Sequence, residues 1–286
     1  MNQGVAPIPA PVRPGPAAAV TDPPPEIDTT LPSHARVWNH WLGGMHNFAV
    51  DRAAGNRLAA DNPGLVERVR TTRHFLARAV RHLALDEGVR QYLDIGSGLP
   101  TAGNTHQIAR RAAPGARVVY VDNDPRAVAY ARSLLAPTDP ESVTCLLADL
   151  REPDALLTAA SRTLDLSSPV ALVLSGILGH VSAYEEACGI VARLMAALPS
   201  GSCLLSHDVS DTAGDWRTIQ ARHNSTADLA YRLRTPEQIA GYFQGLRLVD
   251  PGVVPLTAWR PDTDDPYSRE WAGLVADVVG GVGRKP

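Results

Sequence analysis

The sequence is poor in cysteine, which excludes the structures that cysteines build. Its 286 residues include three, Cys145, Cys188 and Cys203, an odd number without a C-x-x-C pair. Neither a disulfide framework nor a zinc knuckle can form from them. We expect three small, buried side chains instead.

Long apolar runs and an excess of basic residues are also missing. The longest apolar runs are strand-sized, as at residues 170–174, whereas a helix that spans a bilayer needs about 20 residues. The first residues lack the basic start, apolar core and cleavage site of a secretory signal. With 27 Lys and Arg against 30 Asp and Glu, the formal net charge is -3, which disfavours binding to nucleic acid through many phosphate contacts. We expect a cytoplasmic protein without a membrane segment.

Histidines are present, but their arrangement does not favour a metal ion. Three of the nine, His34, His40 and His46, follow one another at intervals of six residues. Six residues turn a helix by about 240°, so successive side chains would point to different faces. We therefore expect no metal site.

The first part of the chain predicts no strands. Residues 1–30 are rich in Pro and Ala and predict a disordered arm. Residues 31–88 predict helices that form an amino-terminal lid. The first helix has an aromatic face with Trp38 and Trp41, which we expect to pack within the lid, and the second begins after Pro63.

Residues 89–286 alternate between short apolar strands and helices, the pattern of an open parallel sheet with crossover helices. We expect an α/β fold of the Rossmann-like type. Ser182 and Glu185 predict a capping box for one of the helices. The predicted strands are residues 91–95, 117–121, 143–147, 170–174, 202–206, 246–249, 253–256 and a last one near 282; the predicted helices are residues 102–112, 125–135, 153–160, 182–198 and 235–243, and residues 261–279 fit either a strand or a helix.

The most informative stretch is Y-L-D-I-G-S-G at residues 92–98, where a strand runs into a glycine-rich turn that opens a helix. Gly96 and Gly98 let backbone amides approach a ligand closely, and Asp94 can accept hydrogen bonds or pair with a cation. The turn predicts half of a nucleotide site. A tight strand-to-helix turn without a ligand is the alternative.

Two further aspartates follow the next two strands. Asp122 ends the second strand, 24 positions after Gly98, where a carboxylate can accept both hydroxyls of a ribose. Asp149 follows the third strand, where a carboxylate can meet the exocyclic amine of adenine. Each alone also fits a helix cap or a loop. Together with the glycine-rich turn they line three adjacent strand ends, which is where open sheets bind ligands.

The spacing discriminates between nucleotides. The third glycine of a G-x-G-x-x-G dinucleotide fingerprint is replaced by Thr101, and there is no G-x-x-x-x-G-K-[ST] phosphate loop. Asp94 would repel a pyrophosphate but attract a cationic amino acid group. The sequence therefore favours a cofactor that carries an amino acid moiety in place of phosphate at this turn.

These residues resemble the D-x-G-x-G turn, ribose acid and adenine-side aspartate of the class I methyltransferases that use S-adenosyl-L-methionine. The chain looks still more like an actinobacterial family of such methyltransferases, whose substrates are largely unassigned. Residues 32–52, P-S-H-A-R-V-W-N-H-W-L-G-G-M-H-N-F-A-V-D-R, resemble its amino-terminal signature. Further similar blocks are L-D-I-G-S-G-L-P-T-A-G-N-T-H, V-V-Y-V-D-N-D-P, A-D-L-R, L-P-S-G-S and G-G-V-G-R-K.

The resemblance implies a seven-stranded sheet whose last strand is antiparallel, with the amino-terminal helices folded over S-adenosyl-L-methionine. It implies two groups of cofactor-binding residues, one at the strand ends and one in the lid. The first group is Asp94, Gly96, Ser97 and Gly98 for the methionine end, Asp122 and Asn123 for the ribose, and Asp149 and Leu150 for the adenine; the second is Asn39, Gly43, Gly44, Asn47 and Phe48.

The sequence departs from this family after the fourth strand. There the family tends to have a Leu-His pair followed by an aromatic residue or a second His, whereas here Leu178 precedes Gly179 and His180. This loop normally faces cofactor and substrate, so the departure bears on the substrate or on activity itself. If the acceptor is a hydroxyl, His180, or His207 and Asp208 after the fifth strand, are candidates for a general base. Capping or loop-stabilising roles fit them as well.

We therefore expect a methyltransferase that acts on a small-molecule acceptor, a partner class indicated by the modest charge and the helical lid. Two alternatives stay open. One is a non-catalytic protein that binds the cofactor as a signal. Gly179, the departure from the family's pattern after the fourth strand, would then reflect the loss of activity. The other is a nicotinamide-dependent oxidoreductase, which Thr101 disfavours.

Overall fold

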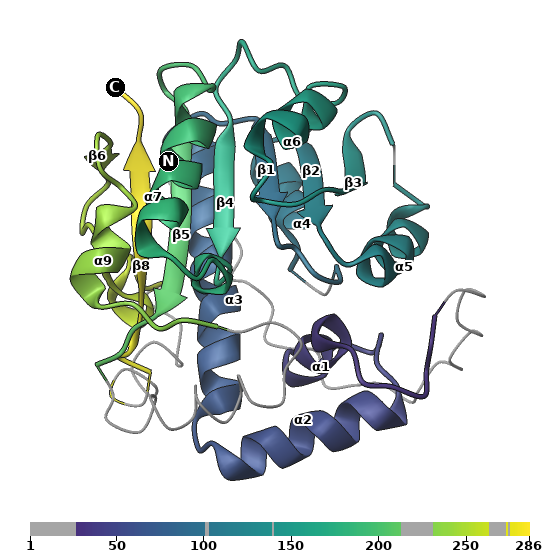
Figure 1. The fold of residues 1–286 in the computed structure, drawn as a ribbon. Coiled ribbons are helices and arrows are strands. Elements are labelled where there is room, and N and C mark those ends of the chain that lie inside the picture. The colour runs from purple at the N-terminus through teal and green to yellow at the C-terminus, as the bar shows by residue number, and fades with distance from the viewer. Residues whose placement is uncertain (1–26, 101–102, 139, 213–230, 263–272, 274) are drawn as a thin grey trace, which may run out of the picture.

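A central, mostly parallel sheet lies between two layers of helices (Figure 1). The computed structural model describes residues 27–100, 103–138, 140–212, 231–262, 273 and 275–286. The strands are β1 (Gln91–Ile95), β2 (Arg117–Asp122), β3 (Val143–Leu147), β4 (Ala171–Ser175), β5 (Cys203–Val209), β6 (Arg247–Leu248), β7 (Val254–Pro255) and β8 (Val278–Arg284).

The strand order is β3-β2-β1-β4-β5-β8-β6. Strands β1 to β5 pair in parallel, whereas β8 runs antiparallel to both β5 and β6. The seven-stranded order with an antiparallel last strand, which the resemblance implied, is therefore confirmed. The two-residue β7 also pairs with β8, so that the sheet has eight strands. Short β6 and β7 replace the longer strands predicted at residues 246–249 and 253–256.

The two faces of the sheet bury separate sets of apolar side chains. On one face α3, α4 and α5 pack over Tyr92 and Val118, and on the other α6, α7 and α9 pack over Leu93 and Leu172. Because neighbouring residues of β1 point to opposite faces and both faces are covered, the strand is buried throughout, including its polar residues Gln91 and Asp94. The helices of the two layers are α3 (Leu65–Leu85), α4 (Thr105–Ala112), α5 (Pro125–Leu135), α6 (Pro153–Ala160), α7 (Tyr184–Ala196) and α9 (Pro236–Gly241), and single turns of 3-10 helix form η1 (Leu178–His180) and η2 (Leu256–Ala258).

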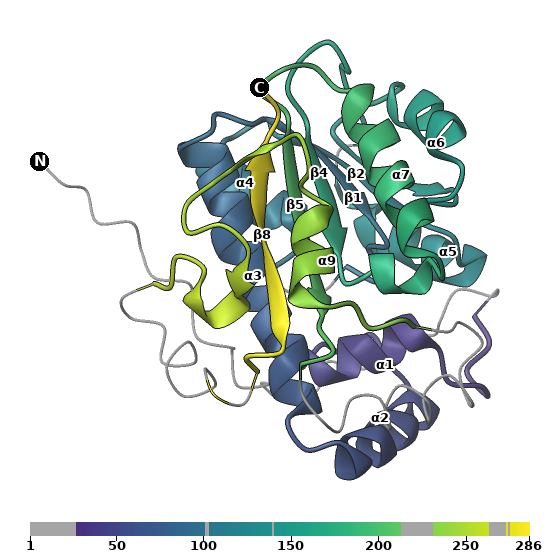
Figure 2. The same ribbon diagram turned by 60° about the vertical axis from the view of Figure 1, so that its left-hand side comes forward.

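Two further helices, α1 (His34–Trp41) and α2 (Ala49–Asp61), lie beyond the carboxyl ends of the strands (Figures 1 and 2). Trp41 packs with Val69 of α3, and its indole Nε1 donates to the carbonyl oxygen of Gly55 at 3.1 Å. Trp38 stands at 5.9 Å from Trp41, ring centre to ring centre. The two tryptophans thus pack against each other, and Trp41 attaches α1 to α3.

A buried ion pair fastens α1 to α2. Arg36 Nε lies 2.8 Å from Asp51 Oδ2, and neither side chain is more than 5% exposed. Asp51 also accepts hydrogen bonds from the backbone amides of Ser33 and Phe48, at 2.9 and 2.8 Å. Arg36 Nη2 donates to the carbonyl oxygen of Leu31 at 2.6 Å. One carboxylate thereby holds the amino-terminal ends of both lid helices.

The sequence did not predict α2, and it misplaced the start of α7. Helix α2 is mostly alanine and charged residues without an apolar stripe, so it lacks the periodic signal of a packed helix. The cap of α7 is Ala183, without a side-chain hydrogen bond; the capping box predicted from Ser182 and Glu185 is wrong, and the Ser182 carbonyl instead accepts from Arg234 Nη2 at 3.2 Å. Cys188 is half-buried, not buried as expected.

Some predictions fall outside the described residues. The arm predicted at residues 1–30 lies there up to residue 26, and so do Thr101 and most of residues 263–274. Within the predicted range 261–279, strand β8 begins at Val278. Among the described residues, no helix has the length and apolar character needed to cross a membrane.

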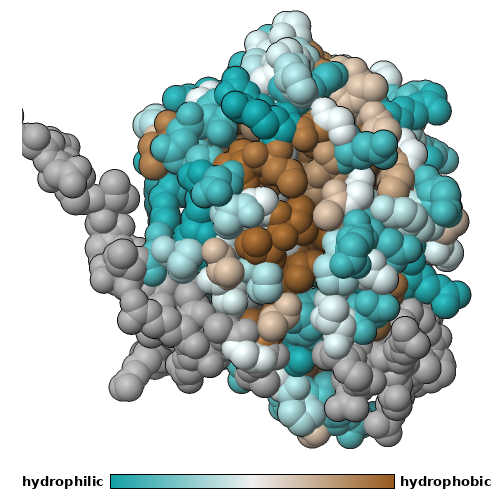
Figure 3. Space-filling model, turned by 90° about the vertical axis from the view of Figure 1, so that its left-hand side faces the viewer, coloured by the Kyte–Doolittle hydropathy of each residue, from teal (hydrophilic) through white to brown (hydrophobic). Residues whose placement is uncertain are grey.

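Two features mark the surface of the molecule. Apolar side chains gather on the face that carries the edge strand β6, where Leu248 is 44% exposed (Figure 3). Lys285, the sequence's only lysine, follows β8, and its Nζ donates to the carbonyl oxygens of Met195, Ala196 and Leu198 at 2.8, 3.1 and 2.5 Å. This ammonium group therefore caps the carboxyl end of α7, where the last carbonyl oxygens of a helix have no hydrogen-bond partner within the helix itself.

Candidate active site

The glycine-rich turn after β1 connects three parts of the carboxyl edge. Gly96 and Gly98 have φ angles of +73° and +59°, a region that residues with a Cβ rarely adopt. The amide of Gly96 donates to the carbonyl oxygen of Val121 at 2.8 Å, which fixes the turn to β2. A Cβ on Gly96 would collide with Ile177 in the loop after β4. Glycine is therefore needed at Gly96 both for the backbone and for packing.

Asp122 is fixed directly beside that turn. Its Oδ2 accepts the amide of Gly98 at 2.9 Å and its Oδ1 accepts the amide of Asp124 at 3.0 Å. Burial raises the pKa of Asp122, and the backbone amides partly oppose this. Each carboxylate oxygen keeps a second lone pair. The 24-residue spacing thus corresponds to a direct hydrogen bond between the two predicted site residues.

Asp149 lies near Asn123, whose side chain contributes to lowering the pKa of Asp149. Arg151, which the sequence analysis missed, donates to Asp149 Oδ1 and Oδ2 at 3.0 and 2.6 Å, and lowers its pKa to about 2. The neighbouring Leu150 is buried among apolar side chains. Asp149 is therefore ionised and already paired.

Asp94 points to the face of the sheet covered by α3 and α4. Its Oδ2 accepts the hydroxyl of Thr105, at the start of α4, at 2.6 Å, and its register partner on β2 is Tyr120. Burial raises the pKa of Asp94 to about 6, against the effects of the Thr105 hydroxyl and of the positive charge on Arg73.

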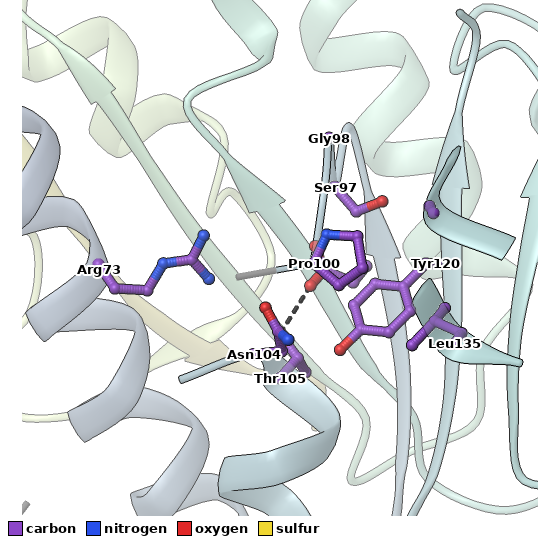
Figure 4. A pocket seen from close by; sticks show the side chains of 10 residues that line it. Arg73, Ser97, Gly98, Pro100, Asn104, Thr105, Tyr120 and Leu135 are labelled. Carbon is purple, nitrogen blue, oxygen red and sulfur yellow. Dashed lines mark hydrogen bonds between the residues drawn. The ribbon is translucent and has the colours of Figure 1, made fainter. Parts of the chain in front are cut away.

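A pocket lies beside Asp94 (Figure 4). One of the side chains that line it is a cationic residue, Arg73, which the sequence did not predict as a site residue. Arg73 points into it from α3, and Tyr120 lies on the opposite side (Figure 4). A signal for Arg73 existed, since it falls four residues after Val69 and three before Leu76, both on the buried stripe of α3. The remaining lining residues come from the glycine-rich turn, α4 and α5: Ser97, Gly98, Pro100, Asn104, Thr105, Ala131 and Leu135.

Of the five predicted lid residues, Asn39 lies near the end of α1 and the other four lie in the turn between α1 and α2. Asn47 Nδ2 donates to Asn39 Oδ1 at 2.9 Å and to the carbonyl oxygen of Gly44 at 2.7 Å. A Cβ on Gly44 would collide with Asn39. Gly43 has a φ of +74°, and Phe48 precedes the first turn of α2. The contacts that the structure gives these residues stabilise the turn itself.

Helix α1 lies close to two turns of the sheet edge. Ala35 Cβ is 3.8 Å from the place that a Cβ on Gly98 would take. The rings of His34 and His180 stand edge to face, with centres 6.3 Å apart. After α1, His46 Nδ1 lies 3.4 Å from the hydroxyl of Tyr130 on α5. The lid therefore touches the loops after β1 and β4 as well as α5.

The predicted catalytic candidates cluster at the ends of β4 and β5. His207 Nε2 lies 2.7 Å from the hydroxyl of Ser175, and burial lowers the pKa of His207 to about 3. Asp208 Oδ1 accepts the hydroxyl of Tyr231 at 2.5 Å, and burial raises the pKa of Asp208 to about 7. His180 is half-buried, and its ring centre is 5.0 Å from that of Tyr231.

Tyr231 is another residue that the sequence did not predict as part of this cluster. Its ring fits there because Gly179 has no side chain. A Cβ at Gly179 would stand 2.5 Å from two ring carbons of Tyr231. The amide of Arg232 donates to the Gly179 carbonyl at 2.7 Å. No sequence pattern indicated this, since the two residues are far apart in the chain and their contact depends on the tertiary fold.

Comparisons with known proteins agree with this geometry. The sequence matches the S-adenosyl methyltransferase family over residues 20–286. A DUF574 family protein from Streptomyces avermitilis is 36% identical, with a TM-score of 0.80 over 91% of this chain and 99% of that one. A methyltransferase candidate from Thermobifida fusca is also 36% identical, with a TM-score of 0.81 over 92% and 98%.

A more distant structure shares the fold alone. An O-methyltransferase family protein from Burkholderia thailandensis is 14% identical, with a TM-score of 0.51 over 82% of this chain and 62% of that one. The comparison with curated proteins gives no match. The family match spans nearly the whole chain, and the fold is that of a class I methyltransferase. The chain therefore belongs to the S-adenosyl methyltransferase family and is an S-adenosyl-L-methionine-dependent methyltransferase.

Proposed function

We propose that the protein methylates a small-molecule acceptor in a space enclosed by helix α1. One observation carries this proposal: α1 approaches two turns at once, with Ala35 beside Gly98 and His34 beside His180. A helix in this position separates the carboxyl edge of the sheet from solvent. Such an enclosed site suits a small acceptor and excludes water from a charged reactant.

In this proposal the strand ends hold the cofactor from β1 to β3. Asp122 binds the ribose, since its carboxylate is already oriented by two backbone amides and has lone pairs left. Asp149 and Leu150 bind the adenine, through a carboxylate that stays ionised and an apolar side chain. The amides of Gly96 and Gly98 and the Asp94 carboxylate receive the methionine end, as a cation beside Asp94 requires.

The lid residues close the site from the other side. Asn39, Gly43, Gly44, Asn47 and Phe48 shape the turn that follows α1, and this turn places the lid over the sheet edge. We propose that these residues contribute to cofactor binding indirectly, because they position α1 over the site.

The cluster after β4 and β5 supplies the acid–base group for a hydroxyl acceptor. Asp208 suits this role because its pKa of about 7 lets it take up a proton near neutral pH. Its Oδ2 is buried and has no hydrogen-bond partner among the described residues. His207, whose pKa lies at about 3, is a much weaker base. His180, between His34 and Tyr231, positions the acceptor. When bound, S-adenosyl-L-methionine supplies the methyl group from its sulfonium.

Calorimetry and methyl labelling test the proposal together. We expect S-adenosyl-L-methionine and its demethylated product S-adenosyl-L-homocysteine to bind, and reduced nicotinamide dinucleotide not to bind. Protein given methyl-labelled cofactor should then label a small-metabolite extract and leave protein and nucleic acid fractions unlabelled.

Each other outcome contradicts the proposal in its own way. Label in a macromolecular fraction would reject the small acceptor. Cofactor binding without label in any fraction of actinobacterial extract would favour a non-catalytic, cofactor-sensing protein. Binding of the nicotinamide cofactor alone would favour an oxidoreductase. The variant Asp122→Ala is the control, since it should weaken both binding and labelling.

A further inference from the structure

Arg73 differs from every other arginine of α3 in having no partner among the residues that the structure describes. Arg68 pairs with Asp277 at 3.0 Å. Arg70 donates to the carbonyl oxygen of Trp41. Arg78 donates to the carbonyl oxygens of Trp259 and Leu256. Arg81 pairs with the Asp262 carboxylate. No hydrogen bond or ion pair within 4 Å reaches Arg73 from any residue that the structure describes.

The missing partner has an energetic consequence. Burial lowers the pKa of Arg73, while Asp94 and Tyr120 counteract this at a distance. A guanidinium that is removed from water without a hydrogen-bonded partner destabilises the folded chain. Helix α3 nevertheless places Arg73 in the pocket, where its neighbours on the same helix all pair with protein groups. This arrangement indicates a partner that the described residues do not supply.

The pocket presents two opposite charges that do not touch each other. Arg73 enters from α3 (Figure 4), and Asp94 of β1 also lines the pocket. Asp94 is bound to Thr105, which fixes the position of its carboxylate. A guanidinium binds a carboxylate through two parallel hydrogen bonds, and a carboxylate binds an ammonium group. A zwitterionic α-amino acid group is the chemistry that satisfies both at once.

We propose that Arg73 binds the α-carboxylate of the methionine end of the cofactor, opposite Asp94, and so makes the pocket selective for adenosyl compounds with an intact amino acid group. This inference rests on the proposed function, which places that end at the glycine-rich turn. It adds a residue from α3, outside the strand ends, to the cofactor site. Arg73 thereby discriminates the cofactor from adenosyl compounds that lack the carboxylate.

The test compares three compounds by calorimetry. S-adenosyl-L-homocysteine has both charges, decarboxylated S-adenosylmethionine lacks the carboxylate, and 5′-methylthioadenosine lacks the whole amino acid group. On the native protein, S-adenosyl-L-homocysteine should bind about 10- to 100-fold more tightly than either of the other two, the range expected for hydrogen bonds to a charged group. This measurement needs no variant.

Variants then assign the selectivity to Arg73. Arg73→Gln should weaken S-adenosyl-L-homocysteine binding by about the same 10- to 100-fold, and 5′-methylthioadenosine binding by less than about 2-fold. Arg73→Lys keeps the charge without the planar fork and should fall between the two. Arg81→Ala on the same helix, where a partly exposed pair with Asp262 is lost, is the matched control and should leave all three affinities unchanged.

The outcomes separate this inference from the proposed function. Equal losses for all three compounds in Arg73→Gln would show a structural role and overturn the inference. Unchanged affinity for S-adenosyl-L-homocysteine in that variant would overturn it too, yet leave the cofactor site as proposed. Native protein that binds none of the three compounds would reject both.

Discussion

Tyr231 occupies the space beside Gly179 that a side chain would otherwise fill. A Cβ at Gly179 would approach ring carbons of Tyr231 to 2.5 Å, and the Tyr231 hydroxyl is anchored to Asp208. Gly179 is the position at which this sequence departs from the Leu-His pattern of the family it resembles. The Tyr231 ring therefore fills the space beside the loop after β4 that a side chain at position 179 would need.

This packing predicts strong coupling between the two residues. Gly179→Ala should destabilise the protein by roughly 1–3 kcal/mol, because the added methyl group must displace a buried ring. In a Tyr231→Ala background the same change should cost far less. Chemical denaturation of the four proteins measures the coupling.

Gly189 is the matched control for this experiment. It lies within α7, where a Cβ would meet nothing within 4 Å. Gly189→Ala should stabilise the protein by about 0.4–1 kcal/mol, because alanine restricts the unfolded chain. If Gly179→Ala is as harmless as Gly189→Ala, then Tyr231 does not occupy that space in solution.

Removing the Asp122 carboxylate should weaken cofactor binding. We expect Asp122→Ala to cost about 1–3 kcal/mol of binding free energy for S-adenosyl-L-homocysteine, the range for hydrogen bonds to a charged group. Asp124→Ala removes the nearby cap of α5, whose Oδ1 accepts the Arg126 amide at 2.9 Å. This control should lower the melting temperature without changing affinity. Equal affinities for Asp122→Ala and the native protein would refute the ribose assignment.

Asp94 predicts a trade-off between stability and cofactor binding. Its folded-state pKa of about 6 lies above the ordinary value of 3.8. Between these two pH values the Asp94 carboxyl group is therefore protonated in the folded state and ionised in the unfolded state. The contribution of Asp94 to the stability of the cofactor-free protein should therefore fall by roughly 2–3 kcal/mol as the pH rises from about 4 to about 6, and then stay level. The other groups that face Asp94 are Arg73, Thr105, Tyr120 and Cys145, none of which titrates in that range.

The variant Asp94→Asn isolates this effect. It keeps an oxygen for the Thr105 hydroxyl but has no charge to bury, so it should melt higher than the native protein at pH 7, and its stability relative to the native protein should rise between about pH 4 and about pH 6. It should also bind S-adenosyl-L-homocysteine less tightly, and the native protein should lose affinity below about pH 6 as Asp94 becomes protonated. Thermal melts and calorimetry across about pH 4 to 8 check both. A variant less stable than native at pH 7 would contradict the prediction.

The ion pair between Arg36 and Asp51 should stabilise α1 and α2 without affecting the stability of the sheet. Asp51→Asn leaves Arg36 without its charged partner, which in buried pairs costs about 3–5 kcal/mol. Because this pair joins α1 to α2, we expect faster hydrogen exchange across residues 33–61 and weaker cofactor binding, with unchanged exchange in β1 to β5. Arg57→Ala, an exposed change on α2, should alter neither. Faster exchange throughout the sheet would instead show that the lid and the sheet unfold together.

Local patterns in the sequence predicted what lies along single strands and their ends. The aspartates after β2 and β3 and the turn after β1 were predictable because parallel strands bring their carboxyl ends to one edge. Asp122 and Gly98 even hydrogen-bond. Helix α2 escaped prediction because alanine gives no stripe to detect.

Residues that act across elements could not be predicted in the same way. Arg73 and Tyr231 reach the site from α3 and from a segment after β5, and their roles depend on which neighbours the fold brings to them. Arg73 left only a local irregularity, a charge on a buried stripe. Tyr231 left none, because the space that it fills is defined by a glycine 52 positions earlier in the chain.

The bond between Lys285 and the end of α7 has a practical side. Reagents that modify ε-amino groups have a single target in this chain, and that target already donates to three carbonyl oxygens. Reductive methylation or amine coupling at Lys285 would therefore compete with a helix cap, so immobilisation for the binding experiments is better directed to another functional group. A protease specific for lysine would find one candidate bond, and proline follows it.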